Sequence, residues 1–334
     1  VRFAGETDSE SYDGYIIVRA KDMAGNKFEV ISDRIVCCNV EPEVIWNTDY
    51  EFGKWTDKDI IIHVESEAQG CGIKKVAYYV SGKKAGEMKY DDLIYKSVYD
   101  IRLDKAAEKK NGYTVEVRVT DNCGNESKRR ERVYIDKKAP AIVLSGVVTG
   151  AYYHDNARLK LEISEVSFND TMVSCDVLRI MDGRVYEENR EVYTPEKYTD
   201  LKEYLFAKEG EYRVNIAALD GAGNKTVLSE VNFVIDKTAP EIFIGGIDDG
   251  SVTNGDVNIT FLCDESFYDT NIVSIDVKRI NKGKQDTGRL DIFEHNEKKE
   301  VKSHTFSGEG TYEITMNAKD KAGNDASRRV LHFT

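Results

Sequence analysis

The cysteine and histidine side chains of this sequence could bind metals or act as nucleophiles, but their spacing fits neither role. The chain has 6 Cys and 5 His, without a His-x-x-x-His pair, a Cys-x-x-Cys pair or a Gly-x-Ser-x-Gly elbow. Adjacent carboxylates occur at Glu187-Glu188, Asp248-Asp249 and Asp264-Glu265. Glycosidase chemistry would also require a cleft that desolvates one carboxyl and raises its pKa. We therefore expect a protein that is not an enzyme.

The charge of the chain and the length of its apolar stretches argue against two classes of partner. The formal net charge is -13, and no cluster of Lys and Arg is interleaved with aromatic residues, so nucleic acid is an unsuitable partner. No apolar stretch approaches the roughly 18 residues that cross a bilayer. We expect no membrane insertion by this segment.

The carboxylates and glycines follow an internal repeat. The pattern Asp-x-x-Gly-Asn begins at Asp22, Asp121, Asp220 and Asp320, with steps of 99, 99 and 100 residues. A second marker, Asp136 to Pro140, returns at Asp236 to Pro240, with a degenerate copy from Asn39 to Pro42. A period of about 100 residues is the size of a complete small domain, so the sequence predicts an array of domains.

The repeat sets the expected boundaries. We place complete repeats at 41–137, 138–237 and 238–334, called repeats 1, 2 and 3 below. Residues 1–40 match only the last third of a repeat and are expected to be the C-terminal part of a preceding one, lacking half of its sandwich. The chain is thus expected to be a monomeric segment of a longer protein.

Apolar residues alternate with polar ones within each repeat, as in Tyr113, Val115, Val117 and Val119. A period of two indicates half-buried strands, and about seven short strands in 100 residues favour an antiparallel sandwich of the immunoglobulin type. The predicted fold is all-β, with tandem immunoglobulin-like antiparallel β-sandwiches in an elongated array. The one helical candidate is residues 195–206, where Tyr198, Leu201, Tyr204 and Leu205 have helical spacing.

Each Asp-x-x-Gly-Asn sequence predicts the turn between the last two strands, F and G. Asp would bond the turn backbone, and Gly would adopt the left-handed conformation. A Tyr eight residues before the Asp, at Tyr113, Tyr212 and Tyr312, occupies the place of a corner tyrosine whose hydroxyl bonds upstream backbone.

These motifs resemble the bacterial immunoglobulin-like tandem repeats of Gram-positive surface and secreted proteins. The signature of that family is approximately Tyr-x-Val-x-Val-x-Ala-x-Asp-x-Ala-Gly-Asn, a strand, and then Asp-Lys-Thr-Ala-Pro. The resemblance covers residues 12–334 and implies an extracellular or cell-surface location. It fixes architecture better than activity, because such domains serve as stalks, adhesin modules and accessory domains.

Two cysteines are expected to be neighbours. Cys71 lies in the loop entering strand C and Cys123 in the F–G turn, and in this fold both loops lie at one end of the sandwich. Because the other repeats have a Cys at neither position, we predict a Cys71–Cys123 disulfide, the alternative being two thiols. Cys175 and Cys263 are expected to be small core residues, and the adjacent Cys37 and Cys38 are assigned no role.

Carboxylates from three segments are expected to converge where one repeat meets the next, and such oxygens could hold a structural Ca²⁺. The alternative is that the turn Asp residues only cap their turns and the linker Asp bonds backbone; no other cofactor is expected. The candidates are Asp136, Glu165 and Asp220 at one junction, and Asp236, Asp264 or Glu265, and Asp320 at the next.

The sequence favours a non-enzymatic extracellular spacer, as a stalk or adhesin segment. A second interpretation is a ligand-binding module for a host protein or glycan, with Tyr186, Tyr193, Tyr198 and Tyr204 as the binding surface. A third is the accessory region of a large extracellular hydrolase.

Overall fold

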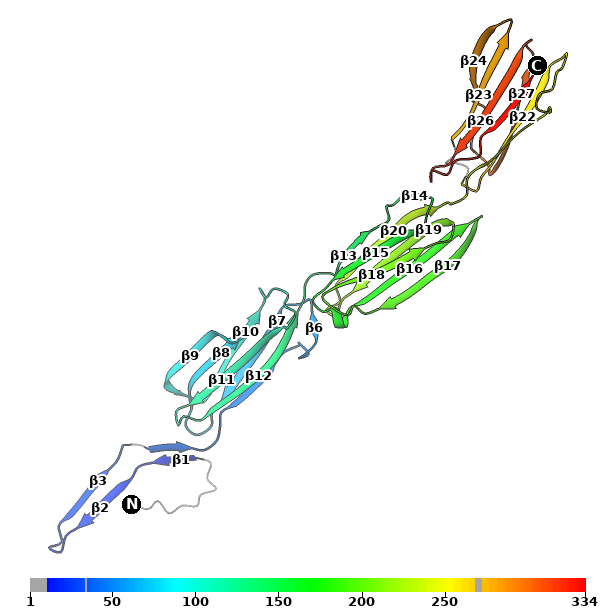
Figure 1. Ribbon diagram of the computed structural model, residues 1–334. Coiled ribbons are helices and arrows are strands. Elements are labelled where there is room, and N and C mark those ends of the chain that lie inside the picture. The colour runs from blue at the N-terminus through cyan, green and yellow to red at the C-terminus, as the bar shows by residue number, and fades with distance from the viewer. Residues whose placement is uncertain (1–10, 34, 268–271) are drawn as a thin grey trace.

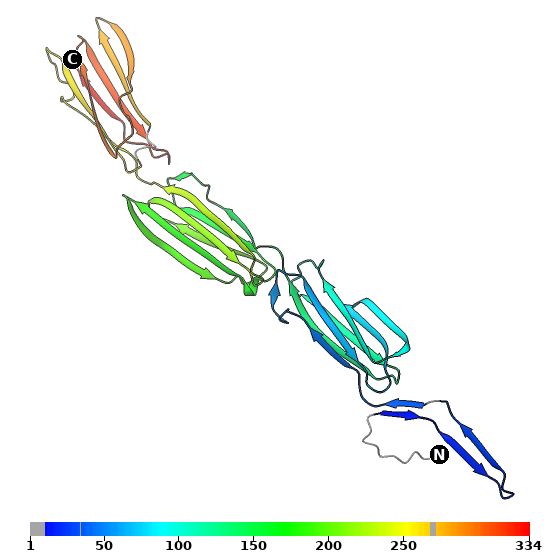
Figure 2. The same cartoon turned by 180° about the vertical axis from the view of Figure 1, so that it is seen from behind.

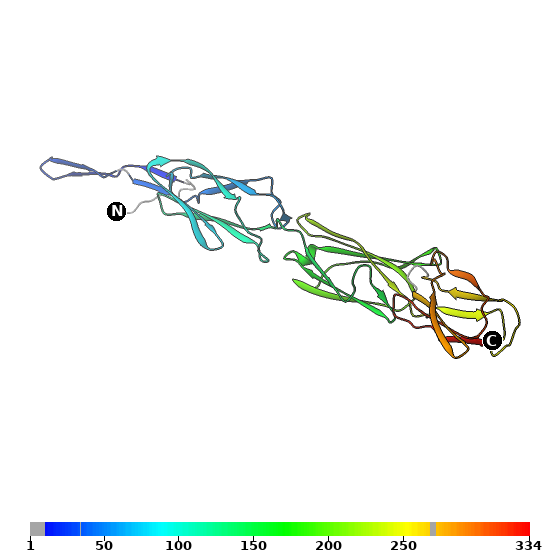
Figure 3. The same ribbon diagram turned by 90° about the horizontal axis from the view of Figure 1, so that it is seen from above.

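The computed structural model describes residues 11–33, 35–267 and 272–334. Three β-sandwiches follow one another end to end, and the strands of residues 11–38 lie beyond the first of them (Figure 1, Figure 2). The view from above shows the same extended row (Figure 3). The predicted fold class, tandem sandwiches in an elongated array, is confirmed.

Repeat 1 consists of two sheets with strand orders β10-β7-β5 and β6-β12-β11-β8-β9. All pairs in it are antiparallel except β6 with β12, which are parallel. Its strands are β5 (Glu43–Asn47), β6 (Trp55–Thr56), β7 (Ile60–Glu67), β8 (Ile73–Val80), β9 (Lys83–Ile94), β10 (Lys96–Leu103), β11 (Tyr113–Asp121) and β12 (Glu126–Ile135).

Repeat 2 has the same arrangement of strands, and repeat 3 differs only in having a single parallel bridge, Ser251 with Phe333, in place of the short parallel edge strand. Their sheets have orders β13-β15-β18 with β14-β20-β19-β16-β17, and β21-β22-β25 with β24-β23-β26-β27. Repeat 2 comprises β13 (Ala141–Ser145), β14 (Tyr152–Tyr153), β15 (Ala157–Ser164), β16 (Met172–Met181), β17 (Arg184–Tyr193), β18 (Thr199–Phe206), β19 (Gly210–Leu219) and β20 (Lys225–Ile235), with the 3-10 turn η1 (Phe168–Asp170). Repeat 3 comprises β21 (Glu241–Gly245), β22 (Val257–Asp264), β23 (Ile272–Asn281), β24 (Lys284–Leu290), β25 (Lys299–Phe306), β26 (Thr311–Lys319) and β27 (Arg329–Phe333).

The strands that precede repeat 1 form two antiparallel ladders. Strand β1 (Ser11–Gly14) pairs with β4 (Ile35–Cys38), and β2 (Ile17–Lys21) pairs with β3 (Lys27–Ile31). Every residue of β2 and β3 is exposed. Among the residues that the structure describes, this F–G hairpin therefore has no second layer over it.

Each sandwich has a core of its own, built from the alternating residues. In β7 and β15, for example, every second side chain is fully buried between the two sheets. The corner tyrosines behave as predicted, since the hydroxyls of Tyr113, Tyr212 and Tyr312 donate to backbone carbonyls 2.7, 2.8 and 2.9 Å away. The period-two pattern thus determines which face of each strand enters the core.

The predicted helix at residues 195–206 is wrong. Residues Thr199–Phe206 form strand β18, which pairs antiparallel with β15 from Ala157 to Ser164. Tyr204 packs against the core, whereas Leu201 and Leu205 are exposed. Pairing along the whole length of β15 outweighs the local helical spacing, as tertiary context often does for a short segment.

The F–G turns have the predicted geometry. In repeat 2 the Asp220 carboxylate accepts hydrogen bonds from the Asn224 backbone N–H and from its side-chain amide, both at 2.8 Å. Gly223 has φ 97°, in the left-handed region that favours glycine. The turn aims Asp220 and Asn224 at the end of the sandwich that meets repeat 1.

Candidate functional site

Two buried clusters of three carboxylates lie at the junctions between repeats. The first contains Asp136, Glu165 and Asp220, and in each cluster one oxygen from every residue lies within 4.8 Å of the others. The second contains Asp236, Glu265 and Asp320, and all six residues are buried. We call these clusters the carboxylate junctions.

Each carboxylate junction takes its residues from two successive repeats. Asp136 follows the last strand of repeat 1, β12, whereas Glu165 follows β15 and Asp220 follows β19 of repeat 2. Asp236 follows β20 in the same way and meets residues after β22 and β26 of repeat 3. The immunoglobulin-like topology brings these loops to one end of the sandwich, facing the incoming linker.

At the second carboxylate junction the sequence left Asp264 and Glu265 as alternatives. The structure brings Glu265 to the cluster, where its Oε1 accepts a 3.2 Å hydrogen bond from the Phe267 backbone N–H. Asp264 is the last residue of β22 and its carboxylate lies 3.7 Å from the Lys299 amine. The two side chains leave the strand on opposite faces, so only one can enter the cluster.

Burial shapes the electrostatics of the linker aspartates. Desolvation, followed by the nearby Glu165 carboxyl, raises the pKa of Asp136 to about 7. Desolvation and the charges of Glu265 and Asp320 likewise raise the pKa of Asp236 to about 7. The Oδ2 atoms of Asp136 and Asp236 are buried and have no hydrogen-bond partner. A buried carboxylate oxygen of this kind needs a proton or a cation.

An asparagine that the sequence analysis did not single out crosses each junction. The Asn224 side-chain amide donates to the Asp136 carbonyl at 3.0 Å, and Asn324 donates to the Asp236 carbonyl at 2.8 Å. The signal was present, because Asn ends every copy of the Asp-x-x-Gly-Asn turn although the turn itself needs only Asp and Gly. These asparagines connect the turn of one repeat to the linker of the previous one.

Further contacts flank the first carboxylate junction. The Lys110 amine of repeat 1 lies 5.0 Å from the ring centroid of Phe168 in repeat 2. Trp55 of repeat 1 packs so closely on Gly221 of repeat 2 that an added Cβ would lie 3.2 Å from its Cδ1. The joint is therefore packed by side chains as well as linked by the chain.

Similar contacts flank the second carboxylate junction. The Lys298 amine of repeat 3 lies 3.2 Å from the Asp182 carboxylate of repeat 2. The Lys321 amine lies 4.5 Å from the ring centroid of Tyr152. Repeats 2 and 3 thus meet on two sides of their linker.

The cysteines are distributed between loops and cores. Cys71 lies beside Cys123, as expected, and the structure joins no pair of the described sulfurs by a disulfide. The Cys71–Cys123 disulfide stays a prediction, and Cys38 also lies near Cys71. Cys175 and Cys263 are buried in the cores of repeats 2 and 3, which confirms their predicted packing role.

The four tyrosines proposed as a binding surface differ in exposure. Tyr193 and Tyr204 pack against the core of repeat 2, and the Tyr204 hydroxyl donates to Glu191 at 3.1 Å. Tyr186 and Tyr198 are exposed, with the Arg179 guanidinium 4.3 Å from the ring centroid of Tyr186. Specific recognition by these residues therefore stays a prediction.

Comparison with known proteins supports an immunoglobulin-like assignment. The family model of a bacterial Ig-like domain matches residues 173–237. The ICAM-5 D1–D4 ectodomain fragment aligns with a TM-score of 0.50 and 8% identity over 87% of this chain and 77% of that chain. At such low identity this similarity shows the fold alone.

Two other solved structures give weaker similarities. Chicken CNTN1 FN1–FN3 domains align with TM-score 0.26 and 13% identity, over 87% of this chain and 98% of that one. The Clostridium thermocellum CbhA fibronectin(III)-like modules align with a TM-score of 0.24 and 17% identity, over 57% of this chain and 94% of that chain. A comparison with curated proteins found no match. Bacterial Ig-like domains, whose family model matches residues 173–237, are typically non-catalytic extracellular modules.

The described residues contain no helix that is long and apolar enough to span a membrane.

Proposed function

We propose that this chain is an extracellular spacer on a bacterial surface or in a secreted protein, a stalk or adhesin segment that holds another module at a distance. Its immunoglobulin-like repeats would be held in line by ions bound at the carboxylate junctions. One observation carries this proposal: each junction buries carboxylates from two successive repeats around a common point. A ligand at that point would connect the repeats directly.

The donor set suits Ca²⁺. Calcium takes oxygen ligands at about 2.3–2.6 Å and tolerates irregular coordination, so three converging carboxylates could provide part of its shell. The linker aspartates leave an acceptor for it, since Asp136 Oδ1 accepts from the Lys138 backbone at 3.2 Å while Oδ2 has no partner. Asp236 repeats the arrangement, with Thr238 donating to its Oδ1 at 3.3 Å.

A junction without an ion is the competing interpretation. Asp220 and Asp320 cap their turns in the structure, as that interpretation requires. Asp136 would then hold a proton, since burial raises its pKa to about 7. A proton neutralises part of the charge, but unlike a multidentate cation it does not hold three segments together.

Small-angle scattering of the full chain, at neutral pH with Ca²⁺ or with excess chelator, tests the proposal. We expect an elongated particle whose maximum dimension and rigidity decrease when the ion is removed. The control replaces both linker acids, Asp136→Asn with Asp236→Asn, and should make the profile indifferent to chelator. Calorimetry of the same samples should show lower melting of repeats 2 and 3 after chelation.

The outcomes separate the two parts of the proposal. A rod that is unchanged by chelator, with an unchanged melt, would remove the ion and leave the spacer. A compact, folded-back particle would argue against the spacer and favour a composite binding surface. Recognition of a host protein or glycan, and a place beside an extracellular hydrolase, stay predictions that no feature of the described residues favours.

A further inference from the structure

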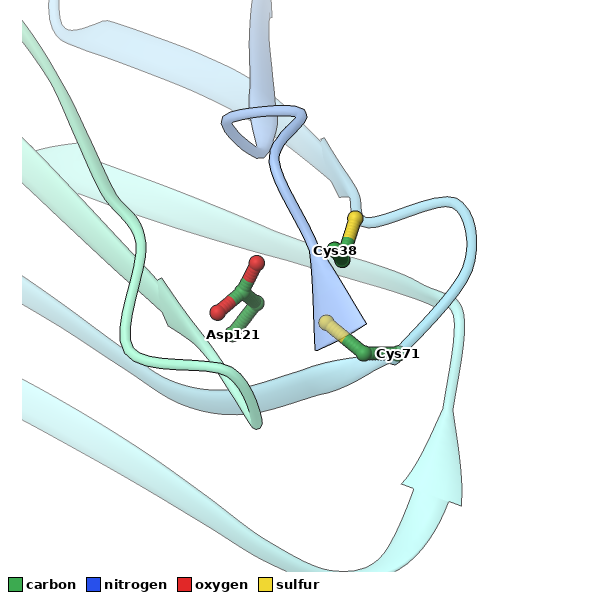
Figure 4. Close-up of side chains that lie close together, drawn as sticks. All are labelled: Cys38, Cys71 and Asp121. Carbon is green, nitrogen blue, oxygen red and sulfur yellow. The ribbon is translucent and has the colours of Figure 1, made fainter. Parts of the chain in front are cut away.

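A third buried cluster lies where the leading hairpins join repeat 1 (Figure 4). Cys38, Cys71 and Asp121 contribute two sulfurs and a carboxylate oxygen that all lie within 4.8 Å of one another. Their exposed fractions are 5%, 1% and 0%. We call this cluster the thiol junction.

The thiol junction occupies the same place in its repeat as the carboxylate junctions. The Asn125 amide donates to the Cys38 carbonyl at 2.7 Å, just as Asn224 donates to the Asp136 carbonyl at 3.0 Å. Asp121 accepts from the Asn125 backbone N–H at 2.8 Å, as Asp220 does from Asn224. Cys38 therefore stands where the later linkers have Asp136 and Asp236.

The second sulfur replaces the glutamate by a different route. The Ala68 backbone N–H donates to the Tyr95 carbonyl at 2.9 Å, which matches the bond from Glu165 to the Tyr198 carbonyl at 2.8 Å. Ala68 thus takes the glutamate position, and Cys71 from three residues further along brings its Sγ to the cluster. Two oxygen donors have been exchanged for two sulfur donors while the turn aspartate is kept.

This exchange changes the ion that the site suits. Thiolates are soft ligands that bind Zn²⁺ well and Ca²⁺ poorly. In a tetrahedral zinc site, with metal–ligand distances of about 2.0–2.3 Å, the donor atoms lie roughly 3.3–3.8 Å apart. The three donor atoms of the cluster lie within 4.8 Å of one another, so small side-chain rotations would bring them to that spacing.

A third sulfur lies next to the cluster. Cys71 makes hydrogen-bond contacts with the side chains of Cys123 and Asp121 and with the Cys123 backbone. Three sulfurs and one carboxylate correspond in number to a closed four-coordinate site.

We propose that Cys38, Cys71 and Asp121 bind a soft or borderline divalent cation such as Zn²⁺, with Cys123 placed to supply the fourth ligand. Binding releases the thiol protons and requires no oxidant. A disulfide would use two of the three sulfurs, would transfer two electrons to an oxidant and would leave Asp121 only its role in capping the turn. The ion ties the linker after β4 to repeat 1, as calcium would do at the carboxylate junctions.

The test is a titration of the full, chelator-stripped chain with Co²⁺, followed by displacement with Zn²⁺. We expect a thiolate-to-cobalt charge-transfer band that saturates at one metal per chain and disappears on addition of Zn²⁺. Cys38→Ser and, separately, Cys71→Ser should weaken Co²⁺ binding by about 10-fold or more, since each substitution removes a thiolate that binds the metal directly. Far-UV circular dichroism checks that each variant remains folded.

The matched control removes a sulfur elsewhere. Cys263→Ala, in the core of repeat 3, should leave the band and its stoichiometry unchanged. Absence of the band, or a band that survives in both folded serine variants, would overturn the proposal.

A second measurement covers the disulfide alternative. Peptide mapping of untreated secreted protein should find Cys38, Cys71 and Cys123 as thiols. A mass lower by two hydrogen atoms, with Cys71 linked to Cys38 or Cys123, would also overturn the proposal. Because the cobalt band reports thiolate ligands only, these failures would leave the calcium proposal for the carboxylate junctions standing.

Discussion

The thiol junction and the two carboxylate junctions share one backbone arrangement but have different atoms at their centres. At all three, an asparagine of the F–G turn donates to a linker carbonyl and a turn aspartate approaches the linker side chain. Two junctions complete the cluster with Asp and Glu, and the first completes it with two cysteines. The same hydrogen bonds between turn and linker therefore occur around different sets of donor atoms.

The difference lies at particular positions of the repeat. The hydrogen bonds of the turn depend on its Asp, Gly and Asn, which every copy retains. The donor atoms of the linker residue, and those of the loop that follows β7, β15 or β22, are oxygen in some repeats and sulfur in another. A single domain type could in this way make joints that respond to different ions. The predictions below test this comparison.

Among the substitutions, the largest effect should follow removal of a buried turn aspartate. Asp220→Ala takes away an acceptor of three hydrogen bonds in a site that is 4% exposed. Charged hydrogen bonds contribute about 1.5–3 kcal/mol each, and we expect the free energy of unfolding of repeat 2 to fall by about 3 kcal/mol. Calorimetry of the full chain measures it.

The matched control is Asp22→Ala in the leading hairpin. Asp22 accepts the same hydrogen bonds from the Asn26 backbone and side-chain amide, at 2.9 and 2.7 Å. It is exposed, and among the described residues it belongs to none of the three clusters. Repeats 1 to 3 should melt unchanged. Equal losses from the two substitutions would show that burial at the junction contributes nothing.

The next effect is a pH dependence of the metal-free carboxylate junctions. Folding raises the pKa of Asp136 and Asp236 from 3.8 to about 7, so the native state binds more protons than the unfolded state between these values. Stability should therefore fall as pH rises from about 4 to about 7, by at most about 1.4 kcal/mol per pH unit for each proton, and be flat above.

Urea unfolding of chelated protein across this range measures the slope. Asp136→Asn should reduce the slope of stability against pH in repeat 2. Repeat 1 has Cys38 at the equivalent position and should lack the pH dependence that comes from a linker aspartate. Because Ca²⁺ competes with the proton, added calcium should stabilise more at pH 8 than at pH 5.5. A calcium effect that is larger at the lower pH would contradict this linkage.

Loss of a bridging amide should have a smaller effect. Asn324→Ala removes the 2.8 Å bond to the Asp236 carbonyl and the 2.7 Å bond to Asp320. We expect a loss of about 1–2 kcal/mol from repeat 3 and wider motion between repeats 2 and 3 in scattering. Asn26→Ala, in the exposed turn, should change neither property; if it does, the bridge is not the cause.

The smallest effect should come from a surface ion pair at the same junction. Lys298 and Asp182 lie 3.2 Å apart with side chains 51% and 60% exposed. Such pairs contribute about 0–1 kcal/mol, so Lys298→Ala should lower stability by no more than about 0.5 kcal/mol. A loss as large as that of Asn324→Ala, measured by the same calorimetry, would show that rim contacts rather than the buried bridge hold the joint.

The fold class, the F–G turns and the corner tyrosines can be predicted from the sequence, because these features depend on local patterns. Alternation of period two sets the buried face of a strand, and Asp and Gly at fixed spacing set a turn. The repeat also predicts that Asp136, Glu165 and Asp220 lie together, because residues at equivalent ends of strands meet whenever domains are stacked.

The remaining features cannot be predicted from local patterns, because each depends on which segments pack together. Residues 195–206 became a strand because β15 has an edge to pair, a fact that local helical spacing does not contain. Glu265 rather than Asp264 entered the cluster because the pleat of β22 directs them oppositely. Cys38 carries no sequence motif, and its meeting with Cys71 and Asp121 follows from the path of a linker across the end of repeat 1. Contacts between distant segments depend on that path, which sequence spacing alone does not specify.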